Sequence, residues 1–395
     1  MMHRRSCLSM MLGTLLPAPA LAAETARADL SADLAPICAQ FNLPALGAAV
    51  TRGADTVAAG VTGVRVWKGD LKVGINDRFH LGSDGKAMTA TLAGMMVEEK
   101  KLDWTTTIGD VLGPFVPGIN AEVAALRLEN LLSHSSGLPS DNEDLLKLYF
   151  TADVLKYNLV DLRLLTFSQY KDHPPISAPG TKFHYSNFGY MIAGMMVEKA
   201  AKTSWEQLIT DRIFTPLGLT TAGLGPQATM GRIDAPVGHD IVNESLNESF
   251  MPMLWGPAAD GPPMLAPAGI AHMSVLDFAT WGAWNAGAGK RGPALVKPDT
   301  LARIHRPMID TGRIPNPRPG TPQEGQYALG WGIVKYDWAP GPVLTHNGSN
   351  GLNLAKIVVD TGRDISLVAV TNIAGPRAED ATNAVVEKLY RRFAA

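Results

Sequence analysis

Segments with strand character lie at both ends of this chain, and the long stretch between them has mostly helical character. The segments that favour strands are 45–52, 56–66, 78–81, 327–336, 343–345, 354–360 and 365–372. Strands from the two ends must pair to bury their apolar faces. The pattern therefore predicts an α/β (α+β) fold, in which one antiparallel sheet is built from N- and C-terminal segments and flanked by helices at 30–41 and 378–393. A mostly helical region is inserted into this sheet, and the junction of two such parts is a common place for a site.

Composition narrows the class of protein. Hydrophobic residues make up 46% of the 395 residues and charged residues 18%, which excludes an intrinsically disordered chain and a coiled coil. The formal net charge is −2, so no basic excess indicates nucleic acid as a partner. The length suffices for two substructures that share a sizeable core.

The first 23 residues have the pattern of a secretory signal. Arg4 and Arg5 provide a positive start, the apolar run 8–16 follows, and the small residues of 20–23 suit a cleavage site. We expect residues 1–23 to be a signal peptide and the protein to be periplasmic or secreted, through a general secretory or a twin-arginine route. No later stretch is apolar enough for a transmembrane helix.

Ser83 and Lys86 form the first motif that can carry chemistry. They follow a predicted strand and open a predicted helix, where a spacing of three residues puts both on one face. Lys86 is the only charged residue in 85–97, and an apolar surrounding favours its neutral amine. Such an amine can take the proton of a Ser hydroxyl. The alternative is Ser83 as a helix N-cap beside a Lys that extends to solvent.

Two further motifs stand far along the chain. Tyr185 and Asn187 lie at a predicted loop-to-helix junction, where a phenol could relay a proton and an amide could hold a substrate carbonyl. The sequence from His346 through Asn347 and Gly348 to Ser349 ends a predicted strand. The backbone N–H groups of Ser349 and Ser83 could together form an oxyanion hole. The alternatives are a buried Tyr with a capping Asn, and an Asn-Gly hairpin turn.

Together, these motifs resemble those of the serine β-lactamase-like superfamily. This group includes class C β-lactamases, D,D-peptidases, D-aminopeptidases and family VIII esterases. The stretches 130–139, 216–219 and 329–332 look like the same family, and the resemblance covers about 43–372. It implies a β-lactamase/transpeptidase-like catalytic domain over 24–395. Its sheet part would be 24–85 and 326–395, and its mostly helical part 86–325.

The resemblance also implies roles for individual residues. Ser83 would be the nucleophile, Lys86 the base in acylation, and Tyr185 the acid/base that protonates the leaving group and activates water. The motifs alone do not decide whether Lys86 or Tyr185 takes the proton of Ser83, since these two groups would titrate as a coupled pair. Asn187 would position the substrate, and His346 would shape the electrostatics near Tyr185.

Differences between this chain and the family's motifs indicate which members of the family it resembles less. Class C β-lactamases carry Lys-Thr-Gly where this chain has His346, Asn347 and Gly348. A neutral His attracts a substrate carboxylate less than a Lys does, which disfavours efficient β-lactamase action. Asp84, beside the nucleophile, is also unusual and could perturb Lys86.

The sequence therefore predicts a secreted serine hydrolase that cleaves an ester or amide of a small molecule or D-amino-acid peptide through an acyl-enzyme on Ser83. An esterase is slightly favoured over a D-aminopeptidase or D,D-carboxypeptidase. The alternatives are a class C-like β-lactamase, a penicillin-binding or sensor protein with little turnover, and an inactive scaffold. No metal or organic cofactor is expected, because the nine His are scattered without metal-ligand spacing.

Overall fold

The structure is a computed structural model and describes residues 27–151, 155–241, 250–254 and 259–394. The predicted signal peptide, 1–23, lies outside the described residues. Nine of the described strands form one sheet in the order β1-β3-β2-β14-β13-β12-β11-β10-β9. Their bounds are β1 Ala28–Asp29, β2 Ala45–Arg52, β3 Asp55–Gly63, β9 Ile309–Asp310, β10 Gly325–Tyr327, β11 Gly332–Val334, β12 Val343–Ser349, β13 Leu354–Asp360 and β14 Ile365–Thr371.

The sheet joins the two ends of the chain, as the sequence predicts. β2, from the N-terminal segment, pairs antiparallel with β14, from the C-terminal segment, along the length of β14. Both strands are almost entirely buried, because helices cover both faces of the sheet. The sheet is not wholly antiparallel, since the short strand β1 runs parallel to β3.

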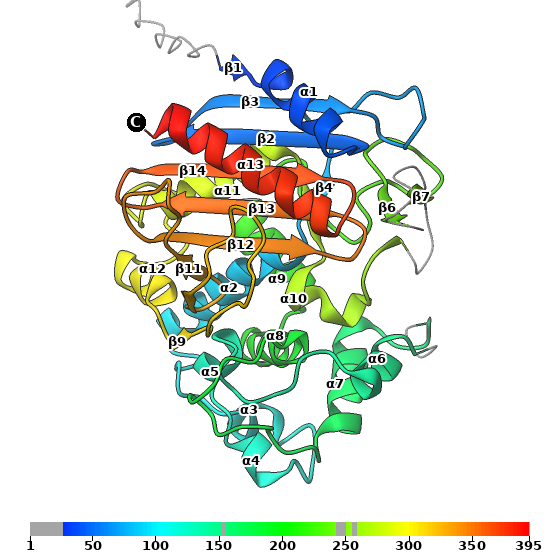
Figure 1. Ribbon diagram of the computed structural model, residues 1–395. Coiled ribbons are helices and arrows are strands. Elements are labelled where there is room, and N and C mark those ends of the chain that lie inside the picture. The colour runs from blue at the N-terminus through cyan, green and yellow to red at the C-terminus, as the bar shows by residue number, and fades with distance from the viewer. Residues whose placement is uncertain (1–26, 152–154, 242–249, 255–258, 395) are drawn as a thin grey trace, which may run out of the picture.

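Two layers of helices enclose this sheet. The helices α1 (Ser31–Gln40) and α13 (Pro376–Phe393) cover one face, and α11 (Val275–Ala286) covers the other (Figure 1). The first layer packs through a separate apolar cluster that includes Leu34, Val385 and Leu389. The second face shares its core with the inserted helical region.

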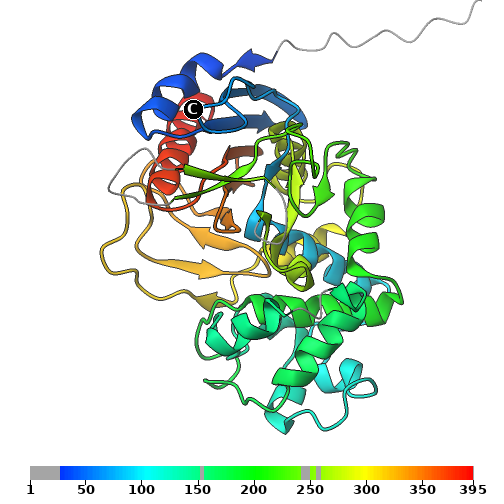
Figure 2. The same ribbon diagram turned by 90° about the vertical axis from the view of Figure 1, so that its right-hand side faces the viewer.

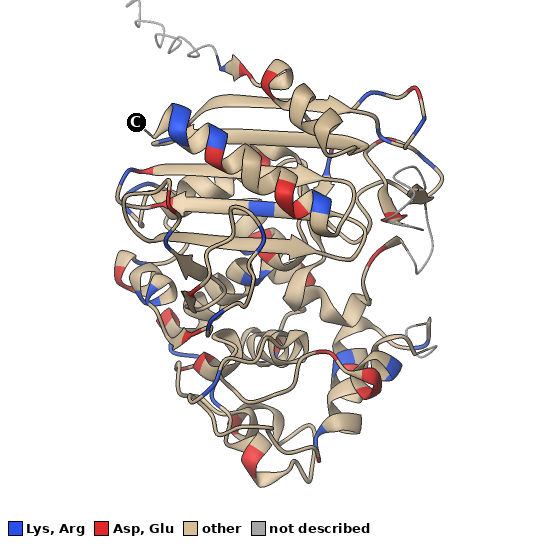
Figure 3. Cartoon of the chain, in the orientation of Figure 1, with Lys and Arg blue, Asp and Glu red and all other residues tan. Residues whose placement is uncertain are grey.

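The inserted region forms the other half of the molecule, next to the sheet part (Figure 2). Its helices are α2 Lys86–Glu98, α3 Ile108–Leu112, α4 Ala121–Ala124, α5 Leu128–Leu132, α6 Glu143–Tyr149, α7 Leu159–Tyr170, α8 Asn187–Ala201, α9 Trp205–Ile209, α10 Ala266–Gly269 and α12 Pro298–His305. α2 and α8 are buried along almost their whole length and pack against each other. Charged residues of both signs are interspersed over both halves (Figure 3), in keeping with the small net charge.

Two expectations about strands are wrong in detail. The segment predicted at 78–81 is β4 (Phe79–His80), which joins β8 (Ala271–Met273) and β5 (Gly223–Leu224) in a separate three-stranded sheet instead of the main one. The segment predicted at 327–336 is two strands, β10 and β11. The chain turns between them at Gly330, whose φ of 80° favours glycine.

Candidate active site

Ser83 lies on a tight turn at the junction of the two halves. It belongs to the 3₁₀ segment η1 (Gly82–Gly85), which connects β4 to α2. Gly82 has a φ of 50°, and a Cβ there would overlap the backbone nitrogen of Ser349. The close approach of β12 therefore requires glycine at this position. The Ser83 side chain makes no capping hydrogen bond, so the alternative of an N-cap is wrong.

Lys86 is fully buried, and its Nζ has three hydrogen-bond partners. Its Nζ lies 2.9 Å from Ser83 Oγ, 2.7 Å from Asn187 Oδ1 and 2.7 Å from the carbonyl oxygen of Ala268. The last two are acceptors only, so each requires an N–H from the amine. The remaining position on Nζ faces Ser83. When Lys86 is neutral, its lone pair therefore points at the Ser83 hydroxyl.

The surroundings of Lys86 favour this neutral form. Burial lowers the pKa of the amine to about 7, while the nearby carboxylates of Asp141 and Asp84 raise it by a smaller amount. A substantial fraction of the amine is therefore unprotonated at neutral pH.

Tyr185 completes the group at the nucleophile. The Lys86 Nζ lies 4.8 Å from the centre of its ring. Burial raises the pKa of the phenol well above its ordinary value, while the Ser83 side chain, which lies near the phenol, lowers that pKa by a smaller amount, so the phenol stays protonated near neutrality. His134 packs against the ring at a centroid distance of 4.1 Å and accepts a hydrogen bond from the Ser186 N–H at its Nδ1. Tyr185 is thus held by a buried neighbour whose backbone is left-handed, at a φ of 57°.

Asn187 is the first residue of α8, and its side chain does not cap that helix. Ser186 is the N-cap, since its hydroxyl accepts the Gly189 N–H. The amide of Asn187 therefore bridges two ionisable groups: its Oδ1 accepts from Lys86, and its Nδ2 donates to Asp141 Oδ2 at 2.6 Å.

The third motif belongs to a regular strand. β12 pairs with β13 through Asn347, Gly348 and Ser349, so the alternative of a hairpin turn is wrong. A Cβ at Gly348 would overlap the backbone of the nucleophile turn, which shows how closely β12 and η1 approach. Asn347 is exposed and accepts a hydrogen bond from Lys356 Nζ at 3.0 Å. Ser349 lines the same cavity as Ser83.

His346 is a buried neutral imidazole. Burial, together with a smaller effect of Lys86, lowers its pKa to about 3. Its Nδ1 donates to the Asn347 carbonyl at 2.9 Å, and its Nε2 accepts from the Tyr327 hydroxyl at 2.8 Å. The ring lies 6.4 Å from that of Tyr185, centre to centre. The position that carries a Lys in the class C pattern therefore holds no cation here.

Asp84, which follows Ser83 in the chain, carries a buried carboxyl group close to His346. Its side chain is fully enclosed, and His346 Nδ1 lies 3.8 Å from its Oδ1. Burial raises the pKa of Asp84 well above its ordinary range, while the nearby Lys356 and Lys86 lower it by less.

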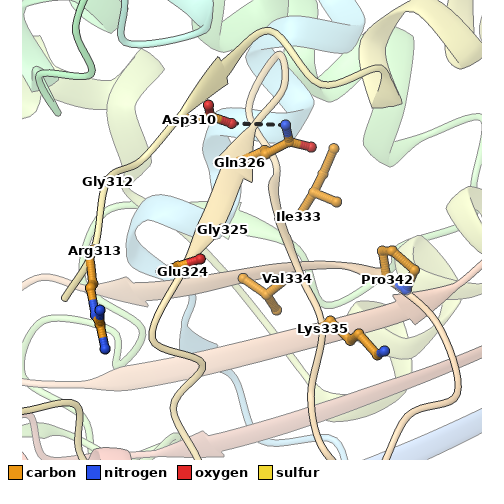
Figure 4. A pocket seen from close by; sticks show the side chains of 10 residues that line it. All are labelled: Asp310, Gly312, Arg313, Glu324, Gly325, Gln326, Ile333, Val334, Lys335 and Pro342. Carbon is orange, nitrogen blue, oxygen red and sulfur yellow. Dashed lines mark hydrogen bonds between the residues drawn. The ribbon is translucent and has the colours of Figure 1, made fainter.

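Of two cavities on the described surface, one is lined by residues predicted for the site and the other is not. A cavity of about 210 Å³ is lined by Ser83, Asn187 and Ser349 and by residues of α6 and α10. A larger groove of about 450 Å³ lies along β9, β10 and β11 (Figure 4), where Gln326 donates to Asp310. None of the residues predicted for the site lines that groove, so the smaller cavity is the candidate active site.

Four groups at this site escape prediction from the sequence. The Ala268 carbonyl carries no side-chain signal, and Asp141 stands in an acidic stretch typical of an ordinary helix start. Tyr327 reaches His346 only through the pairing of β10, β11 and β12. His134 lies in the stretch 130–139, whose likeness to the family could have indicated it.

The described residues include no group of three or more His, Cys, Asp or Glu side chains placed to hold a metal ion. In the same part of the chain, no helix combines the length and apolarity that a membrane crossing needs.

The fold is that of a serine β-lactamase-fold protein. The family model described as Beta-lactamase matches residues 30–391, and the chain belongs to this family of serine hydrolases. It is 26% identical over 302 residues to penicillin-binding protein 4 of Amycolatopsis lactamdurans, covering 74% of this chain and 72% of that protein. It is 25% identical over 322 residues to the unguisins hydrolase ungD of Aspergillus violaceofuscus, covering 78% of this chain but only 54% of that protein.

Solved structures show the same fold. The octameric penicillin-binding protein homologue from Pyrococcus abyssi superposes with a TM-score of 0.73 at 20% identity, covering 91% of this chain and 76% of that one. A D-stereospecific amidohydrolase from Streptomyces sp. superposes with a TM-score of 0.68 at 19% identity, covering 92% and 97%.

Proposed function

We propose that this protein is an exported serine hydrolase that cleaves an ester or amide bond through an acyl-enzyme on Ser83. The observation that carries the proposal is the placement of Lys86: two fixed acceptors take two of its N–H groups, and the third position faces the Ser83 hydroxyl. A base held in this way can activate a hydroxyl at neutral pH.

The proposed reaction moves one proton at each step. Neutral Lys86 takes the proton of Ser83 as Oγ bonds to the substrate carbonyl carbon, and the backbone N–H groups of Ser83 and Ser349 stabilise the oxyanion. The bond to the leaving group breaks as Tyr185 gives that group a proton, and Lys86 returns a proton to Tyr185. In deacylation, Tyr185 takes a proton from the attacking water as it passes its own proton to Lys86. The bond between the acyl carbon and Ser83 Oγ then breaks as Lys86 returns the proton to Oγ, and the acid is released. We assign the first proton transfer to Lys86 because burial lowers its pKa to about 7 while it raises that of Tyr185.

Hydrolysis of a β-lactam is the second candidate, and one observation disfavours it. The position of the Lys in the class C motif is held by His346, which is neutral at pH 7. The nearby Lys356 is buried and donates to Asn347. The names of two relatives, a hydrolase of unguisins and a D-stereospecific amidohydrolase, support amide or ester substrates. A penicillin-binding protein with little turnover is the third candidate.

A panel of three substrates tests the proposal: a short-chain nitrophenyl ester, a D-Ala-D-Ala peptide and a chromogenic cephalosporin. We expect turnover of the ester or the peptide, a burst of the first product, and a mass increase on Ser83 that equals the acyl group. Ser83→Ala is the control. Equal activity in this variant would overturn the proposal, and acylation by the cephalosporin without turnover would favour a penicillin-binding protein.

We also propose export through residues 1–23. Expression of the full chain in a Gram-negative host should give a periplasmic protein whose N-terminus, read by sequencing, lies close to Ala23. An uncleaved protein in the cytoplasm would contradict this.

A further inference from the structure

A carboxylate stands in the candidate active site, and the proposed reaction gives it no role. Asp141 is exposed and lines the same cavity as Ser83. Three hydrogen bonds, of 2.9, 2.7 and 2.6 Å, connect Ser83 to Lys86, Lys86 to Asn187 and Asn187 to Asp141. Only the side chain of Asn187 therefore separates the Asp141 carboxylate from Lys86, the hydrogen-bond partner of Ser83.

No other lining residue in the described part of the chain offsets this charge. The cavity lining includes no Lys, Arg or His. Lys86 lies beneath it with none of its surface exposed and a pKa lowered by burial, and His346 is neutral. A carboxylate in this position attracts a substrate cation and repels a substrate carboxylate.

Asp141 also has capacity for another hydrogen bond. Its Oδ2 accepts the short bond from Asn187, while its Oδ1 accepts the Tyr149 hydroxyl at the longer distance of 3.4 Å. A carboxylate oxygen has two lone pairs, and an ammonium group offers three N–H donors. The open lone pairs can therefore accept from an ammonium group in the cavity.

Much of the rest of the cavity wall is apolar. Two of its side chains, Leu146 and Phe150, are 43% and 66% exposed, and large hydrophobic groups that share an exposed patch mark a binding surface. The apolar lining residues are Leu146, Tyr149, Phe150, Pro262, Leu265 and Ile270. Such a wall favours a substrate that also carries an apolar side chain.

We infer that Asp141 binds an ammonium group of the substrate close to the scissile carbonyl, and that the preferred substrates are esters or amides of amino-acyl groups with an apolar side chain. An α-amino acyl group is the simplest case. This inference rests on the proposed function, since it assumes that the acyl group is transferred to Ser83. It narrows that function from esters and amides in general to those of unblocked amino acids.

The test compares one acyl group with and without its ammonium. The substrates are the para-nitroanilides of both enantiomers of phenylalanine and the matching anilide of phenylpropanoic acid, which lacks the amine. We expect the wild type to prefer one phenylalanine enantiomer over the desamino compound by about 10-fold or more in kcat/KM, as a hydrogen bond between charged groups provides. Asp141→Asn should bring that ratio close to one, mainly by lowering kcat/KM for the ammonium substrate.

The matched control is Asp144→Asn. Asp144 lies three residues away on α6, is 71% exposed, pairs with Lys147 and does not line the cavity. The Asp144→Asn variant should keep the wild-type ratio of kcat/KM between the ammonium and desamino substrates. A wild type without preference for the amine would overturn the inference. The inference also fails if Asp141→Asn lowers kcat/KM equally for both substrates, because Asp141 would then only hold Asn187.

A neutral nitrophenyl ester separates this failure from failure of the proposed function. Turnover of the ester that depends on Ser83, without a preference for the ammonium compound, rejects the role of Asp141 alone. Ester turnover that persists in Ser83→Ala rejects the proposed function, and the inference fails with it. If the folded protein neither turns over any of these substrates nor is acylated by them, the proposed function and the inference both fail.

Discussion

Nε2 of His80 lies 2.8 Å from Oδ1 of Asp260, and this buried pair joins the nucleophile turn to the loop that precedes α10. His80 precedes Ser83 by three residues, and its Nδ1 accepts the Gly82 N–H at 3.0 Å. Asp260 also accepts from Asn350 Nδ2 at 3.0 Å, directly after Ser349. One carboxylate therefore connects the turn that carries Ser83 to the end of β12, where the second proposed oxyanion donor lies.

Replacing His80 should harm both stability and catalysis. His80→Leu leaves the Asp260 carboxylate buried without its imidazole partner and deprives the Gly82 N–H of its acceptor. Loss of a hydrogen-bonding partner from a buried polar group costs about 1–3 kcal/mol, to be measured by denaturant unfolding. Asp260→Asn keeps an acceptor for the imidazole N–H and should cost much less. In the double variant the two costs should fall short of their sum, and strict additivity would contradict the coupling.

Ser83→Ala should abolish turnover and leave the fold intact. The Ser83 hydroxyl caps no helix, and its loss removes one hydrogen bond to Lys86, worth about 1 kcal/mol. The unfolding free energy should therefore stay close to that of the wild type while kcat falls by orders of magnitude. A variant that is inactive because it has unfolded would not support the role of Ser83 as nucleophile.

Local geometry explains which features the sequence could predict. The three-residue spacing of Ser83 and Lys86 places them on one face of any helix, so their contact follows from the sequence alone. The contact of Lys86 with Asn187, 101 residues away, does not follow from local rules and is implied only by the family likeness. The antiparallel pairing of β2 with β14 was predictable because both segments are short, largely apolar runs bounded by polar or turn-forming residues.

The remaining features depend on tertiary contacts that no local pattern encodes. The Ala268 carbonyl reaches Lys86 because α10 packs on the nucleophile turn, and any residue type would supply that oxygen. The segment 78–81 has strand character, but nothing in it specifies that β4 pairs with β8 instead of entering the main sheet. The hydrogen bond between Tyr327 and His346 follows from the turn at Gly330, which in the sequence is only one glycine among many.

Acid should destabilise the protein through buried neutral histidines, of which His239 is the clearest. Its Nε2 accepts the backbone N–H of Trp67 and its Nδ1 donates to the Asn372 carbonyl, both at 3.0 Å, so the neutral ring is fully used. Burial lowers the pKa of His239 to about 4, against an ordinary value of 6.5 in the unfolded chain. Between these values the unfolded chain binds a proton that the folded protein does not, so stability falls as pH falls from about 6.5 toward 4.

His239→Asn should therefore flatten the dependence of stability on pH. Between about pH 8 and pH 5, His239 should lower the unfolding free energy of the wild type by roughly 2 kcal/mol. The unfolding free energy of the variant should fall by about that much less over the same range. Chemical denaturation at several pH values measures both slopes. A variant slope equal to that of the wild type would show that His239 does not remain neutral in the folded protein.

The pH dependence of kcat/KM on a neutral ester should report Lys86. The reaction needs the unprotonated amine, so activity should rise with pH through a midpoint near 7, the value to which burial lowers the pKa of Lys86. His346 should add no inflection between about pH 5 and 8, since its pKa lies at about 3, and Tyr185 should stay protonated throughout. Because the Asp141 carboxylate raises the pKa of Lys86, Asp141→Asn should move the midpoint to lower pH, while Asp144→Asn should not. A midpoint near that of an ordinary Lys, or one that Asp141→Asn leaves in place, would argue against Lys86 as the base that this carboxylate tunes.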